Sequence, residues 1–207
     1  AALASLGALL LADATAIGVA LVCTIWLAVW ALRGRATLRL LAFPLGYLVF
    51  MIPLPSAWVT PLIVKLQLWV SAAGVALLRL GEVPVFRDGN VLTLPGGVEL
   101  FVAEACSGIT SLITLLPIGV FLAYFTESAL WRRGVLVLSV VPIALAGNLL
   151  RVVLTVLLAI RVDVAFATGG PVHEWAGVAT YGLGCLFLLA IGRAMRSLWP
   201  ERDPDPA

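Results

Sequence analysis

The residues best suited to chemistry form the segment Glu104-Ala105-Cys106-Ser107-Gly108, where a polar loop meets a long apolar run. Cys106 stands at the start of a predicted helix. Unpaired backbone N–H groups and the helix dipole at such an end favour thiolate over thiol, and the thiolate is the nucleophilic form. Glu104 and Ser107 are candidate supporting groups, although the charge of Glu104 opposes thiolate formation. The alternative is a small buried cysteine with a packing role.

A second polar pair lies inside an apolar stretch. Asn148 and Arg151 are three residues apart, so they project from one face of a helix. An arginine within a membrane span is retained mainly where it faces a polar cavity or a partner group. Because Asn148 makes the same face polar, we favour a cavity over an Arg151 that reaches out to the membrane interface. For Asn148, a hydrogen bond between helices is an equal alternative.

The only histidine, His173, precedes the last apolar stretch and can carry a proton near neutral pH. Of the three cysteines, Cys23 and Cys185 lie in apolar runs, where we expect buried structural roles and no disulfide framework. Because no Cys/His cluster has the spacing of metal ligands, we predict neither a metal nor another cofactor.

Composition identifies the class of protein that must position these groups. Hydrophobic residues make up 62% of the chain and charged residues 12%, and the mean hydropathy is +1.12. These values, with several apolar stretches, predict an all-α polytopic bundle in a lipid bilayer. The 13 Lys and Arg against 11 Asp and Glu leave a net charge of +2, which implies no nucleic-acid surface. The chain begins Ala-Ala without Met, so we expect earlier helices to be missing.

The apolar stretches predict the membrane spans. A helix ends at about Leu11, before Asp13. We expect the integral membrane domain to cover residues 1–196 and a polar tail to cover 197–207, with 200–207 disordered. The predicted spans are Thr15–Leu32, Leu40–Pro55, Ser107–Phe125, Val135–Ile160 and Trp175–Met195.

Basic loops set the predicted orientation, because cytoplasmic loops carry an excess of Lys and Arg. The basic positions are Arg33, Arg35, Arg39, Arg132, Arg133, Arg193 and Arg196. With these on the cytoplasmic side, Cys106 and the loop at 161–174 lie outside, near the outer half of the span that holds Arg151. The chain must then cross an odd number of times between Leu40 and Leu80. We therefore predict that Ala57–Leu80, which contains Lys65, is an interfacial or re-entrant helix on the outer side.

The connection from Gly81 to Glu104 is the one stretch with strand character. Apolar alternation and turn residues predict a small external hairpin or meander that leads into Cys106. Its predicted strands are Val83–Phe86, Val91–Leu94 and Val98–Val102, with turns at Arg87–Asn90 and Pro95–Gly97.

These motifs, in this order, resemble the exosortase/archaeosortase family of membrane-embedded sorting transpeptidases. The resemblance rests on Glu104 to Gly108, on the run Pro142 to Val152, and on His173 before a glycine-containing span. Upstream, Phe43-Pro44, Met51 to Pro55, Gly81 to Val85 and Gly89-Asn90 are also similar, so the likeness extends over about residues 36–191. It implies that Cys106 is the nucleophile and that Arg151 and His173 complete the catalytic site.

The resemblance also implies substrates and a location. It implies a cysteine protease/transpeptidase of the plasma (inner) membrane, with its site on the extracytoplasmic side. The substrates would be exported proteins with a C-terminal sorting signal: a short motif, of the Pro-Glu-Pro (PEP-CTERM) type in bacteria, then a transmembrane helix and a basic tail. Cleavage would pass through a thioester, and the acceptor would be water, a glycan or a lipid.

Two other functions remain open from the residues alone. A transporter or channel subunit would use the stripe of Asn148 and Arg151 to line a solute path. A non-catalytic assembly protein of an envelope polysaccharide system is the third possibility. Neither requires a thiol, so chemical blockade of Cys106 separates both from the enzyme.

Overall fold

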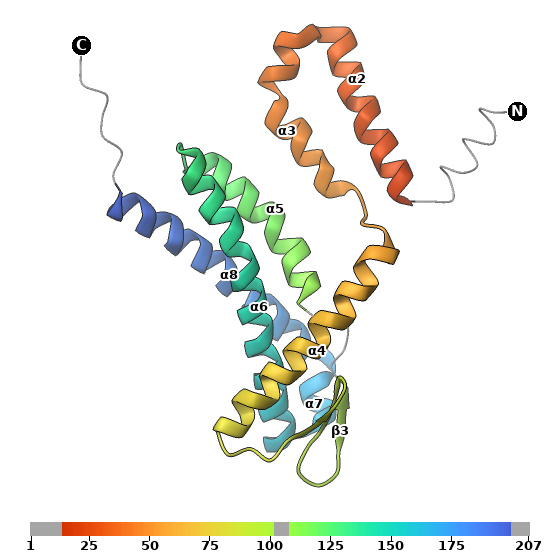
Figure 1. Ribbon diagram of the computed structural model, residues 1–207, viewed down its shortest axis with the longest axis vertical. Coiled ribbons are helices and arrows are strands. Elements are labelled where there is room, and N and C mark those ends of the chain that lie inside the picture. Colours follow the sequence, from red (N-terminus) through yellow and green to blue (C-terminus); the bar gives the residue numbers. More distant parts are fainter. Residues whose placement is uncertain (1–13, 102–107, 200–207) are drawn as a thin grey trace, which may run out of the picture. The chain divides into compact units, whose positions relative to one another are not determined.

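The computed structural model describes residues 14–101 and 108–199, and Figure 1 shows the course of its helices and strands. Within these residues, five helices are long and apolar enough to cross a membrane. The same residues contain one three-stranded sheet. These features confirm the predicted polytopic helical fold. The chain divides into two compact units, residues 1–60 and 61–207.

The first unit is a helical hairpin. Helix α2 (Ala14–Leu40) bends at Gly34, whose φ of 77° lies in the left-handed region that favours glycine. Helix α3 (Ala42–Tyr47) and the 3-10 helix η1 (Leu48–Met51) return beside α2 in the upper part of Figure 1. The indole N–H of Trp26 donates a hydrogen bond across this hairpin to the carbonyl oxygen of Leu45, at 3.0 Å.

The predicted span over Leu40–Pro55 is wrong in length. The structure has six residues of α-helix followed by four of 3-10 helix there. Such a segment reaches only about 17 Å, against a hydrocarbon core of about 30 Å. Pro53 and Pro55 follow directly, and neither has the backbone N–H that a continuing helix requires.

Helix α4 (Ser56–Leu80) covers the segment predicted as interfacial or re-entrant. It is one continuous helix of 25 residues and is among the five that are long and apolar enough to span. Its polar residues Gln67 and Ser71 are buried, and the Ser71 hydroxyl donates to the Gln67 carbonyl oxygen at 2.7 Å. Because Gln67 and Ser71 are buried, they do not make the outer face of α4 polar. The predicted position of helix α4 at the membrane surface remains a prediction.

The predicted external meander is an antiparallel sheet of β1 (Phe86–Asp88), β2 (Val91–Thr93) and β3 (Glu99–Phe101). Leu92 pairs with Leu100, and both side chains are buried. The first strand covers Phe86–Asp88, whereas the predicted strand was Val83–Phe86. Arg87 and Asp88, which were predicted as turn residues, therefore belong to the strand. Glycine makes this shift possible, because Gly89 at φ 60° allows a tight turn that pairs Asp88 with Val91.

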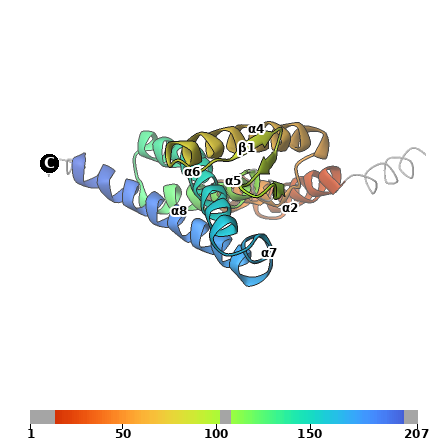
Figure 2. The same ribbon diagram turned by 90° about the horizontal axis from the view of Figure 1, so that it is seen from below.

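Three long helices complete the second unit: α5 (Ile109–Thr126), α6 (Leu130–Arg161) and α8 (Gly170–Leu198), with the short α7 (Val164–Thr168) before α8. Helix α6 lies between α4 and α8 (Figure 2). One hydrophobic cluster joins α4, the sheet, α7 and the C-terminal half of α6. A second joins α5, the N-terminal half of α6 and α8. Helix α6 is thus the element that positions the others.

At the end of the bundle away from the sheet, one buried carboxylate residue contacts side chains of α6 and α8. Glu127, in the loop between α5 and α6, is 2% exposed and forms an ion pair with Arg196 of α8. Its second oxygen lies 3.9 Å from Arg132 Nη1 on α6. The Arg133 Nε donates to the Glu127 carbonyl oxygen at 2.7 Å. One acidic residue therefore holds the ends of three helices.

Candidate active site

Asn148 and Arg151 lie on the inner part of α6. Asn148 is fully buried, at 0% exposure, and continues the row of buried residues formed by Val140, Ala144 and Val152. Residues four apart share one helix face, so this row faces the neighbouring helices. Arg151, three residues on, is half-buried. The prediction that both residues share one face is consistent with this geometry.

The start of α5 packs against Asn148. Gly108 is the N-cap of α5, with a φ of 86°. A Cβ added to Gly108 would lie 3.4 Å from the Cβ, Cγ and Nδ2 atoms of Asn148. Both the positive φ and this close approach favour glycine. The amide of Asn148 therefore lies beside the N-terminus of α5, and Gly108 follows Cys106 by two residues.

Helix α8 passes directly over Arg151. A Cβ added to Gly177 would lie 3.5 Å from Arg151 Nη2 and 3.6 Å from its Cζ. The guanidinium therefore lies close to α8, within van der Waals contact of the Cβ position at Gly177. His173 precedes Gly177 by about one helical turn. Two glycines thus bring α5 and α8 close to the polar pair on α6.

The structure describes the remaining predicted site residues only in part. Glu104, Cys106 and Ser107 lie outside the described residues. The backbone of His173 belongs to the first turn of α8, whereas its side chain is outside the described part of the structure. Helix α8 begins at Gly170, because Pro171 is well suited to the first turn of a helix, and its candidate membrane span is Glu174–Leu198, which His173 precedes as expected. The structure thus brings together Asn148, Arg151, Gly108 and Gly177.

Sequence reasoning did not identify Gly108 and Gly177 as parts of this site. Gly108 belonged to the quoted motif without a role, and Gly177 was not singled out. A glycine carries no chemistry of its own, so the useful signal was its spacing from Cys106 and His173. Within residues 14–101 and 108–199, no three His, Cys, Asp or Glu side chains form a group that could hold a metal ion.

The two other cysteines differ in burial. Cys185 is half-buried in α8, next to the second hydrophobic cluster. The expected buried role is wrong for Cys23, whose side chain is exposed on α2. Lipid is as apolar as a protein interior, so a cysteine on a membrane helix needs no protein neighbours to shield it.

Comparison with known proteins gives one family. No curated protein and no solved structure matches the chain significantly. The family model described as transmembrane exosortase matches residues 1–190. Members of this family are generally cysteine-peptidase-like, and the match supports a membrane transpeptidase-type function and the processing of exported proteins. Together with the five span-length helices, this match makes the chain a multi-pass membrane protein that belongs to the transmembrane exosortase family.

Proposed function

We propose that this chain is a membrane-embedded cysteine protease and transpeptidase that cleaves the C-terminal sorting signal of exported proteins. One observation carries the proposal: Asn148 and Arg151 contact the glycine at the start of α5 and a glycine near the start of α8. The first glycine follows Cys106 in the chain, and the second follows His173 by about one turn. The family match supports the same class of reaction.

In the proposed reaction, the Cys106 thiolate attacks the scissile carbonyl carbon, and the C–N bond then breaks to leave a thioester. His173 gives a proton to the departing amine, while Arg151 stabilises the negative charge that develops on the carbonyl oxygen. Water, or a nucleophile of a glycan or lipid, attacks the thioester and releases the thiolate. The supporting polar residues are Glu104, Ser107 and Asn148.

The proposed site lies on the extracytoplasmic side of the plasma (inner) membrane. The orientation rests on the arginines at the end of the bundle away from the sheet, Arg132, Arg133 and Arg196. The partners are exported proteins whose C-terminal signal comprises a short motif, a transmembrane helix and a basic tail. The acceptor of the transferred protein is a component of the cell envelope.

A transporter or channel subunit is less well supported. Asn148 is fully buried, with its amide against Gly108, and Arg151 lies close to α8 at Gly177. Both side chains therefore pack against helices, whereas residues that line a solute path face an open channel. A transporter or an assembly protein also has no need of a thiol. Alkylation of Cys106 would leave either function intact and would abolish that of the enzyme.

The decisive experiment replaces each cysteine in turn. Cys106→Ala should insert and fold normally, because the side chain that is lost is small, yet it should abolish cleavage of a tagged substrate with a sorting signal. Cys23→Ala and Cys185→Ala are the matched controls and should process normally. Mass spectrometry of a Cys106 thioester with the substrate would identify the intermediate. Normal processing by Cys106→Ala would refute the acyl-transfer mechanism.

A further inference from the structure

A polar pocket lies at the end of the second unit away from the sheet. Its volume is about 560 Å³, within the range of about 300–1,000 Å³ that is typical of small-molecule sites. Its lining comes from α5, from the loop that follows, from α6 and from α8, and includes Arg132, Arg133 and Arg196. Glu127 is the one acidic side chain in this lining. Three positive charges against one negative charge leave +2, which favours an anionic ligand.

Glu127 holds these arginines in place. Its side chain is 0% exposed, and it forms ion pairs with Arg196 and, at 3.9 Å, with Arg132. Arg133 is held at two points: its Nε donates to the Glu127 carbonyl oxygen at 2.7 Å, and its Cζ lies 5.1 Å from the ring centroid of Tyr124. Because the guanidinium groups are already positioned, little side-chain entropy is lost when a ligand binds.

Two of these arginines retain donors for a ligand. Arg133 is half-buried and Arg196 is exposed. In the part of the chain that the structure describes, the hydrogen bonds of Arg133 use only Nε, and those of Arg196 use only Nη1. The remaining N–H groups of a guanidinium form a planar fork that matches the oxygens of a phosphate. The pocket can therefore bind a phosphate through two arginines from different helices.

The surroundings of the pocket are aromatic and exposed. Phe125 also lines the pocket, and it packs against Phe121, one turn earlier in α5, with ring centroids 4.6 Å apart. These two side chains are 62% and 47% exposed. Trp131, next to Arg132 in α6, packs against Trp199. Because tryptophans and arginines gather at the level of the lipid headgroups, an anion with an apolar tail suits this position better than a soluble anion.

We infer that this pocket binds the phosphate of an anionic phospholipid from the leaflet at this end of the bundle. Basic pockets between transmembrane helices are suited to anionic headgroups. The phosphate oxygens accept hydrogen bonds from Arg133 and Arg196, and an acyl chain packs along Phe125 and Phe121. The lipid thereby connects the ends of α5, α6 and α8. The inference does not depend on the proposed reaction, because the lining contains none of the candidate catalytic residues.

A matched pair of serines tests the position of the lipid. Ser128→Glu adds a carboxylate within the pocket, whereas Ser197→Glu adds the same charge on α8 outside the lining, and both serines are exposed. Native mass spectrometry of the purified chain, titrated with phosphatidylglycerol in detergent, measures the affinity. Ser128→Glu should bind at least tenfold more weakly, because the added carboxylate repels the phosphate and competes for the arginines. Ser197→Glu should bind like the unmodified chain. Equal affinities of the two variants would overturn the inference.

A second pair removes a donor. Arg133→Gln should weaken phosphatidylglycerol binding about tenfold, the usual scale of a hydrogen bond to a charged group. Arg193→Gln, which removes the same charge from an exposed position of α8 outside the lining, is the control and should bind normally. Phosphatidylglycerol should therefore raise the Tm of Arg193→Gln more than that of Arg133→Gln, each measured against its own lipid-free value. The same increase in both variants would indicate general attraction to the basic surface and would contradict the inference.

Two further ligands distinguish the source of the phosphate. Phosphatidylcholine with the same acyl chains should bind about tenfold more weakly than phosphatidylglycerol, because its choline cation adds a like charge beside the arginines. Inorganic phosphate at an equal concentration should not displace phosphatidylglycerol, because it has no acyl chain to pack on Phe121 and Phe125. Equal affinity for the two lipids, or displacement by inorganic phosphate, would refute a site for an anionic phospholipid.

Discussion

Arg151 is the residue at which chemistry and packing are most directly distinguished. Its guanidinium lies close to α8, with Nη2 3.5 Å from where a Gly177 Cβ would be, so it is held between two helices. An arginine that merely reached the interface would be replaceable by lysine, which has a similar apolar stem and a cationic tip. An arginine that binds an oxyanion uses a planar fork of donors that lysine lacks.

Arg151→Lys should therefore be expressed normally and should form the acyl-enzyme about 10²- to 10³-fold more slowly, the usual effect of losing one oxyanion donor. Substrate binding should be nearly unchanged. Single-turnover thioester formation in detergent, with a binding assay in a Cys106→Ala background, separates the two steps. Arg161→Lys, at the exposed end of the same helix, is the control and should react normally. A normal rate in Arg151→Lys would leave this residue with an interfacial role alone.

At the residue scale, the polar pair was predictable and its neighbours were not. The spacing of Asn148 and Arg151 within an apolar stretch was sufficient to place both on one helix face. The packing of Gly108 and Gly177 against them depends on how closely three helices approach one another. No local pattern in a single sequence encodes that distance, because a glycine in an apolar run is equally compatible with open space. Gly182, five residues after Gly177, has no neighbouring atom within 4 Å of an added Cβ.

Among the glycines that the structure describes, Gly119 of α5 makes the closest approach to another helix, α6. A Cβ added to Gly119 would lie 2.4 Å from Val140 Cγ2, and Val140 is fully buried. A β-branched side chain cannot easily turn away, because its χ1 is restricted in a helix. Gly119→Ala should therefore lower the free energy of unfolding by about 1–3 kcal/mol through overpacking.

Thermal unfolding in detergent measures this effect. Gly134→Ala is the matched control, since no atom lies within 4 Å of an added Cβ at that exposed position of α6. It should be neutral or stabilise slightly, as alanine favours a helix over glycine by up to about 1 kcal/mol. Adding Val140→Ala to Gly119→Ala should restore part of the loss. Equal stability of the Gly119 and Gly134 variants would contradict the close approach.

At the element scale, the long helices and the sheet followed from composition and alternation, whereas one apolar segment was given the wrong length. Leu40–Pro55 has span-like composition, but Pro53 and Pro55 shorten its helix. Helix α4 has the predicted extent, and its polar residues Gln67 and Ser71 are buried within the protein. Hydropathy cannot distinguish a polar residue that faces water from one that faces another helix, so this burial could not be predicted from composition.

The orientation of the whole molecule depends on how many times the chain crosses between Leu40 and Leu80. With α4 as the crossing helix and Ala42–Met51 too short to cross, that number is still odd. The predicted side of Cys106 therefore does not change when the two segments exchange roles. The parity of crossings is a more robust prediction than the identity of the crossing segment.

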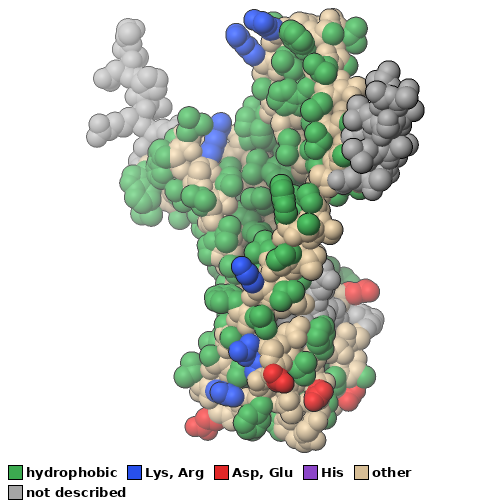
Figure 3. Space-filling model, turned by 45° about the vertical axis from the view of Figure 1, so that its right-hand side comes forward, with side chains coloured by type: hydrophobic (Ala, Val, Ile, Leu, Met, Phe, Trp, Pro, Cys, Tyr) green, Lys and Arg blue, Asp and Glu red, His purple; other side chains and the backbone are tan. Residues whose placement is uncertain are grey.

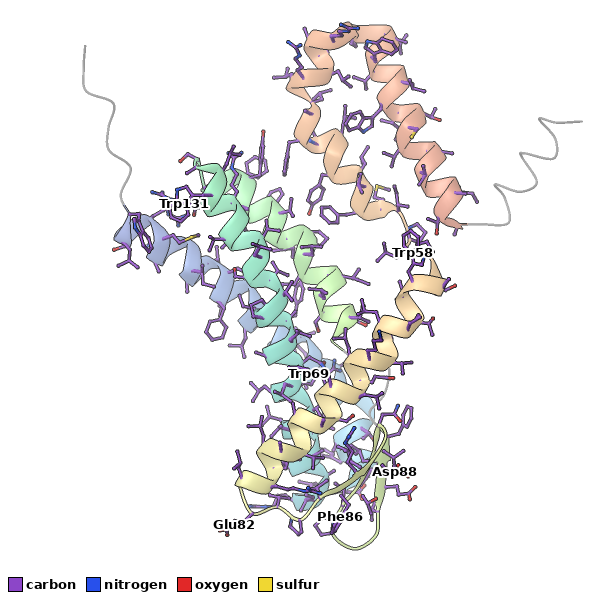
Figure 4. The ribbon with its side chains drawn as sticks, in the orientation of Figure 1. Trp58, Trp69, Glu82, Phe86, Asp88 and Trp131 are labelled. Carbon is purple, nitrogen blue, oxygen red and sulfur yellow. The ribbon has the colours of Figure 1, made fainter. Side chains whose placement is uncertain are left out.

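The two ends of the second unit also differ in composition. Glu82, Phe86 and Asp88 lie at the end that carries the sheet, while Trp131 lies at the other (Figure 4). In Figure 3, acidic side chains gather at the sheet end of this unit, and a largely hydrophobic surface extends away from it. Trp131 packs edge-on against Trp199 with centroids 5.8 Å apart, next to Arg132. Tryptophan beside arginine is typical of a membrane–water interface on the cytoplasmic side.

Labelling with a membrane-impermeant maleimide tests this orientation. In a background without native cysteines, Asp88→Cys at the end of strand β1 should react in intact cells, whereas Ser128→Cys, in the loop between α5 and α6, should react only after the cells are opened. Both positions are exposed, so a difference in reactivity reports the side of the membrane and not burial. They also lie at opposite ends of α6, whose 32 residues extend about 48 Å and so exceed the hydrocarbon core. Reaction of Ser128→Cys alone in intact cells would invert the orientation and place the proposed catalytic residues in the cytoplasm, where exported substrates could not reach them after translocation.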